Sequence, residues 1–281
     1  MEFDHYVRLT HMPLPPSVPA ARPASTAPGE VGRDPLLLHV ALTELPSPAT
    51  AVQWLSIDGA ESLMIQGSQG ADGTRTPNIT VRAGASTRDF ERLSGQQQAV
   101  TVNGHSATAA TTTVQNRPAT VVRWQVASGL WLQVFAGVDR STAVAIAARV
   151  RLDQVYRCGA PLRLTRTPSG AHVSACSVAF TSGPATGRVS VAVGAWTVTV
   201  DAMPGTLPNP TQTLGRWPAT VVEHPGDGGS RIMEITLAVG DRIASLTAEG
   251  PYDAAVVRAI AEGYTPTGGA DPTNWPANPL G

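Results

Sequence analysis

Short runs of alternating apolar and polar residues, separated by glycine-containing turns, fill most of the chain between residues 36 and 266. In one such run, Trp196, Val198 and Val200 point to one side while Thr197 and Thr199 point to the other. This period of two is typical of a strand with one buried and one solvated face. Strands are predicted at residues 36–42, 52–57, 62–66, 78–83, 99–103, 107–113, 120–126, 130–135, 162–167, 172–180, 188–193, 196–201, 217–224, 231–239 and 242–248.

The period lengthens to that of a helix at two places. Ser141 has the residue type of an N-cap and precedes a modest apolar stripe over residues 142–150. Asp253 is the expected N-cap of a second helix, which Gly263 ends. Because each helix follows a group of strands, we expect an α+β fold of two similar domains, each an antiparallel β-sheet covered by a C-terminal α-helix.

The spacing of these signals indicates an internal duplication. Gly104 precedes Ser141 by 37 residues, and Gly215 precedes Asp253 by 38 residues, with strands and a hairpin between them in both cases. A competing alignment uses Pro-Ala-Thr-Val-Val, which occurs at residues 118–122 and again at 218–222. The two alignments differ in register, so only one of them can describe a repeat.

Composition divides the chain further. Residues 1–34 are rich in proline, alanine and serine and are predicted to be a disordered linker, because such a stretch buries too little apolar surface to offset its ordering entropy. The first domain is then expected at 35–157 and the second at 158–266. Residues 267–281 are predicted to be a flexible tail, in which Trp275 is expected to be exposed or to dock on the surface of a partner.

Charge excludes some partners. Only 15% of residues are charged and the net charge is −1, while all 20 basic residues are arginine, which fits a GC-rich bacterial genome. Nucleic-acid binding calls for a dense basic stripe, which this sequence lacks, so no nucleic-acid partner is expected. The first ten residues do not resemble a signal peptide, and no apolar segment is long enough to form a membrane helix. The expectation is an ectodomain normally anchored through a segment missing here.

The two cysteines allow two interpretations, and their position beside the same predicted hairpin favours the first, a disulfide. Cys158 and Cys176 form a disulfide that closes a loop of about 18 residues and contributes about 3 kcal/mol, or they are reduced and unrelated. A disulfide predicts an extracytoplasmic compartment, the cell envelope, whereas reduced thiols are compatible with the cytoplasm.

Candidate chemistry is sparse. Ser106, in Gly-His-Ser-Ala-Thr at 104–108, is the nearest match to a serine nucleophile elbow, but its last position is not glycine and a strand follows it. The six histidines show no metal-ligand spacing and are interpreted as solvent or strand-face residues. The carboxylates, Glu61 among them, are scattered and many lie near turns. No catalytic, cofactor-binding or metal-binding residue is therefore predicted, and we expect a protein that is not an enzyme.

Three segments carry a resemblance to known proteins: Val-Thr-Val-Asn-Gly-His-Ser-Ala at 100–107, Val-Val-Arg-Trp-Gln-Val at 121–126 and Gly-Leu-Trp-Leu-Gln-Val at 129–134. This pattern resembles extracytoplasmic domains of actinobacterial membrane-anchored proteins of unknown function, some of them anti-sigma-factor-like. The second half, at 161–165 and 177–180, is similar more loosely, and also to PsbP-like lipoprotein domains of mycobacteria. The likeness spans about residues 36–265 in short motifs, and this sequence departs from the pattern in having no anchor.

The resemblance implies a non-enzymatic sensory or interaction module of the cell envelope, with a protein partner or a hydrophobic ligand and no cofactor. Two alternatives remain beside it. One is a carrier of a lipid or small hydrophobic ligand, and the other is a hydrolase that uses Ser106.

Overall fold

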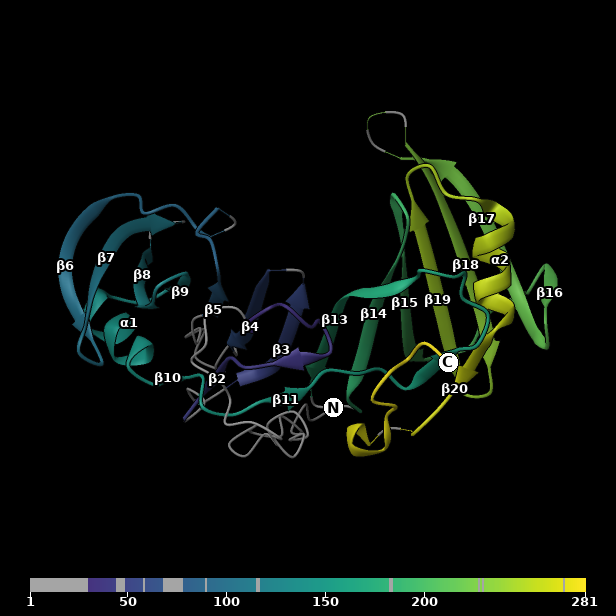
Figure 1. Ribbon diagram of the computed structural model, residues 1–281, viewed down its shortest axis with the longest axis horizontal. Coiled ribbons are helices and arrows are strands. Elements are labelled where there is room, and N and C mark those ends of the chain that lie inside the picture. The colour runs from purple at the N-terminus through teal and green to yellow at the C-terminus, as the bar shows by residue number, and fades with distance from the viewer. Residues whose placement is uncertain are drawn as a thin grey trace, which may run out of the picture. The chain divides into compact units, whose positions relative to one another are not determined.

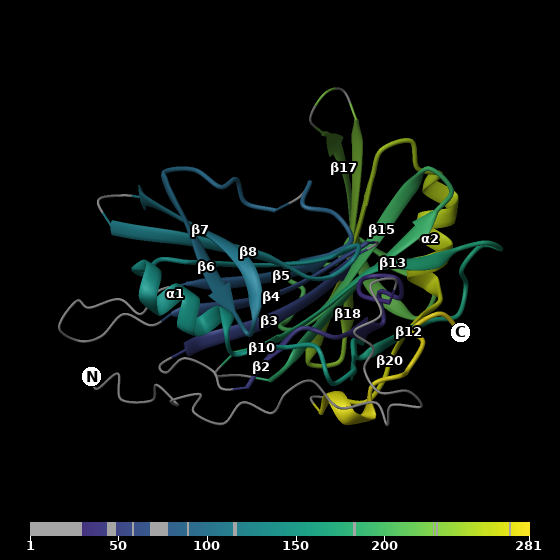
Figure 2. The same cartoon turned by 60° about the vertical axis from the view of Figure 1, so that its left-hand side comes forward.

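The computed structural model describes residues 30–43, 49–57, 59–67, 78–88, 90–114, 117–181, 184–226, 228, 230–269 and 271–281 (Figures 1 and 2). The chain forms two compact units. The first unit contains residues up to 157 together with 179–183, and the second contains residues 158–178 and 184–281.

Seven long strands form the sheet of the first unit. They are β3 (Ala49–Ile57), β4 (Ala60–Gly67), β5 (Ile79–Gly84), β6 (Gln96–Val102), β7 (His105–Val114), β8 (Arg117–Ala127) and β9 (Leu130–Ala136). Their order in the sheet is β3-β4-β5-β9-β8-β7-β6, and each of these neighbouring pairs is antiparallel. Two short pairs stand apart: β1 (Leu37–Leu38) with β11 (Tyr156–Arg157), and β2 (Ala41–Leu42) with β10 (Val150–Arg151).

Helix α1 (Arg140–Ala147) follows β9 and packs on β6 to β9 of this sheet. Its buried residues are Ala143, Ile146 and Ala147, so small side chains let the helix lie close to the strands. The core of the unit is apolar, and its fully buried side chains include Val52, Trp54, Leu63, Ile65, Ile79, Val81, Val122, Leu130 and Val134.

The second unit contains the strands β13 (His172–Phe180), β14 (Thr186–Val193), β15 (Trp196–Pro204), β16 (Gln212–Leu214), β17 (Trp217–Pro225), β18 (Arg231–Val239) and β19 (Arg242–Glu249). Phe180, at the end of β13, is counted with the first unit, where its ring meets that of Trp54 edge-on at 5.9 Å. Helix α2 (Ala254–Glu262) follows β19 and packs on β18 and β16. A short pair, β12 (Leu162–Leu164) with β20 (Tyr264–Pro266), and the 3-10 helix η2 (Pro272–Asn274) complete the unit.

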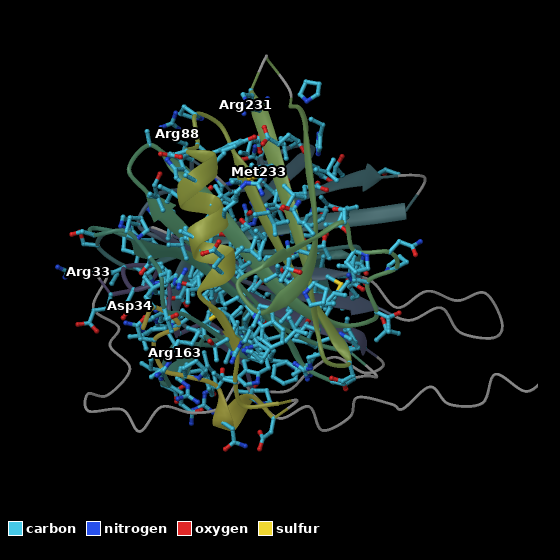
Figure 3. All side chains as sticks on the ribbon, turned by 90° about the vertical axis from the view of Figure 1, so that its right-hand side faces the viewer. Arg33, Asp34, Arg88, Arg163, Arg231 and Met233 are labelled. Atoms are coloured by element: carbon cyan, nitrogen blue, oxygen red, sulfur yellow. A yellow bond between two sulfur atoms is a disulfide. The ribbon has the colours of Figure 1, made fainter. Side chains whose placement is uncertain are left out.

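Strand β18 shows how the second unit alternates between core and surface. Met233 is completely buried, as is Ile235, while Glu234 between them is exposed. Arg231, the first residue of the same strand, is labelled with Met233 in Figure 3. Its guanidinium is hydrogen-bonded to Glu223 at 2.7 Å and lies 5.1 Å from the centre of the Tyr252 ring. The guanidinium is thus shared between an exposed ion pair and a cation–π contact with the buried Tyr252.

The strand orders of the two units correspond element by element. In the second unit the order is β13-β14-β15-β19-β18-β17-β16, which is the first unit's order with ten added to each label, and a helix follows the last strand in both. The turn between β6 and β7 contains Gly104, and the equivalent turn between β16 and β17 contains Gly215, so the alignment of these two glycines is the one that matches equivalent strands. Pro118 lies in β8 but Pro218 lies in β17, which are not equivalent strands.

The observed fold is mostly β, with two short helices, and is less helical than the predicted α+β class. The first helix also begins earlier than predicted. Its N-cap is Asp139, whose carboxylate accepts a hydrogen bond from the backbone N–H of Thr142 at 3.0 Å, and the helix ends at Ala147. Ser141 lies inside the first turn and donates to Asp139 instead. The caps of the second helix, Asp253 and Gly263, are as predicted.

Both predicted unstructured ends contain packed residues. Val31 and Gly32 are buried in the first unit, although they were placed in the linker, and residues 1–29 lie outside the described part of the chain. Trp275 is only 3% exposed and donates its indole N–H to the carbonyl of Gly269, so the prediction of an exposed indole is wrong. Leu280 then pairs with Leu164, which fixes this end of the chain to the second unit.

Candidate functional site

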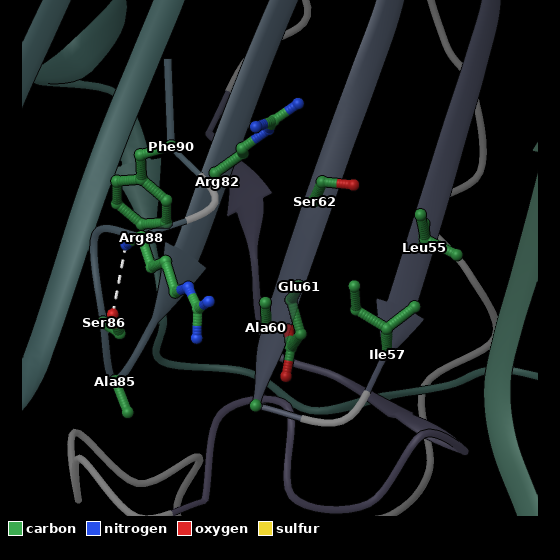
Figure 4. A pocket seen from close by; sticks show the side chains of 11 residues that line it. Leu55, Ile57, Ala60, Glu61, Ser62, Arg82, Ala85, Ser86, Arg88 and Phe90 are labelled. Atoms are coloured by element: carbon green, nitrogen blue, oxygen red, sulfur yellow. Dashed lines mark hydrogen bonds between the residues drawn. The ribbon is translucent and has the colours of Figure 1, made fainter. Parts of the chain in front are cut away.

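A cavity of about 640 Å³ opens in the first unit at the ends of β3, β4 and β5 (Figure 4). Leu55 and Ile57 reach it from β3, Ser62 from β4 and Arg82 from β5. The other lining residues belong to the β3–β4 turn, the start of β4 and the segment after β5; they are Gly59, Ala60, Glu61, Ala85, Ser86, Arg88 and Phe90. The volume matches the size that small-molecule sites usually have.

One wall of the cavity is apolar. Leu55 and Ile57 alternate with the buried Ser56 along β3, and Ile57 is 38% exposed, which is unusual for a large aliphatic residue. Phe90 faces them across the opening in Figure 4 and is itself 7% exposed. Of these apolar residues, Ile57 is exposed, Leu55 is half-buried and Phe90 is buried.

The rest of the rim is cationic. The Arg82 guanidinium lies 3.5 Å from the carboxylate of Glu91, with both side chains about a third to a half exposed, so this ion pair is weak and easily exchanged. Arg88 is exposed and points into the opening in Figure 4, and its backbone N–H is held by the Ser86 hydroxyl at 3.1 Å. Among the described residues, no acid pairs with the Arg88 guanidinium.

The segment that carries Arg88 and Phe90 is anchored to the sheet through Glu91. The amide of the buried Gln133 on β9 accepts from the Glu91 backbone N–H at 2.8 Å and donates to the Glu91 carbonyl at 2.9 Å. Arg123 donates to the same carbonyl and stacks over Phe90 at 5.7 Å, and burial lowers the pKa of this guanidinium. These contacts fix the rim of the cavity, so the cavity exists before any ligand arrives.

Glu61, one of the lining residues, forms a buried pair with His39. Glu61, which is 2% exposed, accepts hydrogen bonds from the backbone N–H groups of Gly32 at 2.9 Å, His39 at 2.6 Å and Val40 at 3.2 Å. Its Oε1 also lies 2.6 Å from the Nδ1 of His39, which is equally buried. Burial alone lowers the pKa of His39, but the hydrogen bond and the charge of Glu61, with smaller effects of Glu30 and Asp34, outweigh it and raise that pKa above its usual value.

This pair resembles the acid–histidine half of a hydrolase triad, but its contacts point to a structural role. Three backbone N–H groups and the imidazole use the acceptor sites of Glu61, and both residues are only 2% exposed although Glu61 borders the cavity. Ser56 lies opposite Glu61 in the β3–β4 register, yet its buried hydroxyl makes no hydrogen bond to His39. The cluster fixes residues 30–40 against β4.

The residues singled out in the sequence lie elsewhere. Cys158 and Cys176 form a disulfide in the second unit, with their Cα atoms 6.0 Å apart. Ser106 is an exposed residue of β7, outside the cavity lining, and is not on a strand-to-helix turn. Within the described ranges, no group of three or more His, Cys, Asp or Glu residues is arranged to hold a metal ion, and no helix has the length and apolar character to cross a membrane.

Sequence reasoning did not find the cavity. Arg82 and Arg88 are spaced as ordinary surface arginines, and only Phe90, one of four phenylalanines in the chain, is an uncommon residue in a segment that is otherwise polar. The pairing of His39 with Glu61 joins residues that are 22 positions apart, so no local spacing could have shown it.

No protein-family model and no curated protein matches the chain. Among solved structures, it is similar to MucB in complex with MucA(peri), with a TM-score of 0.26 and 11% identity over 77% of this chain and 92% of that one. The MucA/MucB complex of Pseudomonas aeruginosa gives a TM-score of 0.27 and 12% identity, and MucB itself gives 0.22 and 11%. Scores of this size establish neither a shared fold nor a shared partner.

Proposed function

We propose that this protein is a non-enzymatic binding module of an extracytoplasmic compartment, and that its cavity binds a small amphiphile with an anionic group. The observation that carries the proposal is the lining itself. Two arginines, Arg82 and Arg88, lie at the opening, and the cavity is lined by Leu55 and Ile57 on one side and by Phe90 opposite them.

The lining favours an amphiphile over a purely polar or purely apolar ligand. A carboxylate, phosphate or sulfate group would take a charge-assisted hydrogen bond from Arg88, and would compete with Glu91 for Arg82. An alkyl or ring portion would then cover the partly exposed Ile57, and each buried CH₂ contributes roughly 0.8 kcal/mol. Glu61 does not oppose an anion strongly, because four hydrogen bonds already compensate its charge.

The compartment is argued from the disulfide. A bridge between Cys158 and Cys176 persists where the surroundings are oxidising, as in the bacterial periplasm or at the cell surface. This agrees with the cell-envelope setting that the sequence resemblance implies.

We further infer that the two units are independent domains that arose by duplication. The support is that seven strands and a following helix recur in one order, with equivalent glycine turns. Experimental coordinates of the chain in which residues 49–147 and 172–262 fail to superimpose, strand for strand, would remove this inference.

Calorimetric titration with dodecyl phosphate below its critical micelle concentration tests the proposed ligand class. We expect saturable binding at one site, and at least tenfold weaker binding of dodecyltrimethylammonium, which has the same tail and the opposite charge. Arg88→Gln should weaken dodecyl phosphate binding about tenfold, which corresponds to roughly 1.4 kcal/mol.

The matched control is Arg163→Gln, which removes an exposed arginine of β12 in the second unit and should leave binding unchanged. Equal affinity for both detergents, or an equal loss in the two variants, would show that the anionic site is not in this cavity.

A further inference from the structure

The β3–β4 turn that borders the cavity is held by the segment before β1. Gly59 donates its backbone N–H to the carbonyl of Gly32 at 2.9 Å, and Gly32 donates its own N–H to the Glu61 carboxylate at 2.9 Å. A Cβ on Gly32 would lie 2.2 Å from the backbone nitrogen of Ala60, so the two segments are in close contact. Gly59, Ala60 and Glu61 all line the cavity (Figure 4). The cavity wall is therefore part of the buried cluster around Glu61.

The charge of this cluster depends on one imidazole. Among the described residues that line the cavity, Glu61 is the one acid, and its Oε1 lies 2.6 Å from the Nδ1 of the buried His39. With His39 protonated, the pair has no net charge. A neutral imidazole keeps one N–H and can still donate this hydrogen bond, but the pair then has one negative charge beside the cavity.

The acids around His39 favour its protonated form. Glu61 acts on it from β4, and Glu30 and Asp34 act from the segment before β1. Burial lowers the pKa of His39, but the hydrogen bond to Glu61 and the charges of these three acids outweigh the burial. The pKa of His39 therefore lies above its ordinary value of 6.5, so the cluster loses its proton only as the pH rises above that value.

The neighbouring strands leave His39 as the group that titrates near neutral pH. Strand β3, which contacts β1, contains no ionisable residue, and Glu61 is the ionisable residue of β4. Strand β11, the partner of β1, contributes Arg157 and Tyr156, and burial raises the pKa of the Tyr156 phenol. Among these described residues, only His39 is of a type whose charge changes between pH 5 and 8.

We propose that the cavity binds its anionic ligand together with a proton on His39, so that the ligand is held at mildly acidic pH and released as the pH rises. The proposal rests on the ligand class inferred above and adds the regulation of its binding. An anion beside Arg82 and Arg88 meets a neutral pair in the protonated state, and an uncompensated Glu61 carboxylate once the proton is lost. Repulsion between two unit charges in one partly buried site weakens binding about tenfold.

This coupling is reciprocal. If the proton on His39 tightens ligand binding about tenfold, the ligand must tighten proton binding by the same factor. Saturation with an anionic ligand should then raise the pKa of His39 by about one pH unit. Affinity and proton binding are separate measurements, and both must change together.

The first test is calorimetric titration of the full chain with decyl sulfate, below its critical micelle concentration, from pH 5.5 to 9. The sulfate group stays charged over this range, so a change in affinity comes from the protein. The wild type should bind about tenfold more weakly at pH 9 than at pH 5.5.

His39→Asn shows whether the imidazole is responsible. An asparagine keeps an N–H donor near the position of Nδ1 but takes up no proton. This variant should bind decyl sulfate at every pH with the weak affinity that the wild type has at pH 9. The matched control His172→Gln replaces an exposed histidine of β13 in the second unit, and should keep the wild-type pH dependence.

Should the asparagine variant fail to fold, the wild type answers the same question by NMR of its ¹³C-labelled imidazoles. Saturating decyl sulfate should raise the pKa of His39 by about one pH unit. Decyl maltoside, which has the same tail and a neutral head group, should leave it unchanged.

The outcomes separate this proposal from the one on which it rests. Binding of decyl sulfate with equal affinity at pH 5.5 and 9 would overturn the proton coupling and leave the anionic site standing. The coupling to His39 would also be wrong if His39→Asn kept the wild-type pH dependence, or if the ligand left the pKa of His39 unchanged. Absence of binding at every pH would remove the site and the coupling together.

Discussion

Glu61 is a carboxylate in an apolar interior, and a buried charge is tolerated only where hydrogen bonds and an opposite charge compensate it. Here the compensation comes from a distant part of the chain, the backbone of residues 32, 39 and 40 and the imidazole of His39. Gly32 is required at its position, because a Cβ there would lie 2.2 Å from the backbone nitrogen of Ala60. Glu61 thus holds the backbone of residues 32–40 against the start of β4.

Replacing Glu61 with Gln should destabilise the protein by about 3–5 kcal/mol, because an amide cannot accept all of these hydrogen bonds and leaves His39 without its counter-charge. Urea unfolding measured by tryptophan fluorescence gives the difference. The control Glu91→Gln removes an exposed ion pair and should cost less than about 1 kcal/mol. Similar losses in both variants would contradict the structural role of Glu61.

The raised pKa of His39 predicts a pH dependence of stability. A histidine whose pKa is higher in the folded state than its ordinary 6.5 binds its proton more tightly when folded. Its contribution to stability is therefore complete below pH 6.5 and is lost as the pH rises from there through the folded-state value. The free energy of unfolding, measured from pH 5.5 to 9, should fall more steeply for the wild type than for His39→Asn. If the free energy of unfolding has the same pH dependence in the wild type and in His39→Asn, the titration of His39 does not contribute to stability.

The sequence predicts that His39 lies at the solvent or on a strand face and that Glu61 is one of many scattered carboxylates. Both residues are in fact buried and paired. Composition could not show this, because the pairing depends on how residues 30–40 cross the start of β4, which is a tertiary feature. By contrast, the bond between Cys158 and Cys176 was one of two interpretations already open from the sequence, and the structure selects it.

At the scale of elements, long strands were predictable and short ones were not. Residues 172–180 and 231–239 were predicted with the observed bounds of β13 and β18, because alternation over nine residues is a strong local signal. The two- and three-residue strands β10, β11, β16 and β20 have no pattern of their own and exist because a neighbouring segment pairs with them. The cavity depends on the segment after β5, which is placed by Gln133 of a strand far along the chain.

The start of α1 gives a second lesson at this scale. Ser141 and Asp139 are both good N-cap residue types, and the choice between them depends on geometry. Asp139 accepts from the Ser141 hydroxyl, the Thr142 backbone N–H and the Thr142 hydroxyl, and these hydrogen bonds lower its pKa to about 2.

Asp139→Ala should therefore lower the melting temperature by about 2–4 °C at pH 7, and Ser141→Ala should lower it by less. Since the folded-state pKa is depressed, the benefit of Asp139 is present above its ordinary pKa of 3.8 and disappears as the pH falls toward 2. Melting curves at pH 7 and near pH 2.5 check both parts. A larger drop in melting temperature for Ser141→Ala than for Asp139→Ala would indicate that Ser141 is the N-cap, as the sequence predicts.

At the scale of the whole molecule, the sequence predicts groups of strands that are each followed by a helix, and the structure has seven long strands and a following helix in each unit. The spacing of Gly104 and Gly215 from the two helix starts was one of two alignments that the sequence left open, and it is the one whose turns join corresponding strands. The amount of helix was overestimated, because each helix is short relative to the seven strands that accompany it. The ends of the chain were predicted from composition, which says nothing about side chains such as Val31 and Trp275 that dock into the two units.

Reduction of the disulfide should destabilise the second unit. The bond closes a loop of 18 residues, for which loop entropy gives about 3 kcal/mol, so Cys158→Ala/Cys176→Ala should lower the free energy of unfolding by roughly that amount. Thiol titration of the denatured wild type, purified from its native compartment without reductant, should find no free thiol before reduction and two after it. Two free thiols at the outset would remove the argument for an oxidising compartment.

The hydrogen bond from Gly32 to Glu61 has a practical consequence for shortened versions of the protein. A fragment cut at the compositional boundary, starting at residue 35, would discard one of the donors on which the interior acid relies, together with the buried side chain of Val31. In such a fragment the buried Glu61 carboxylate would lack the hydrogen bond from the Gly32 backbone N–H, which should destabilise the folded state. Expression trials that begin at or before residue 30 should yield markedly more folded material than those that begin five residues later.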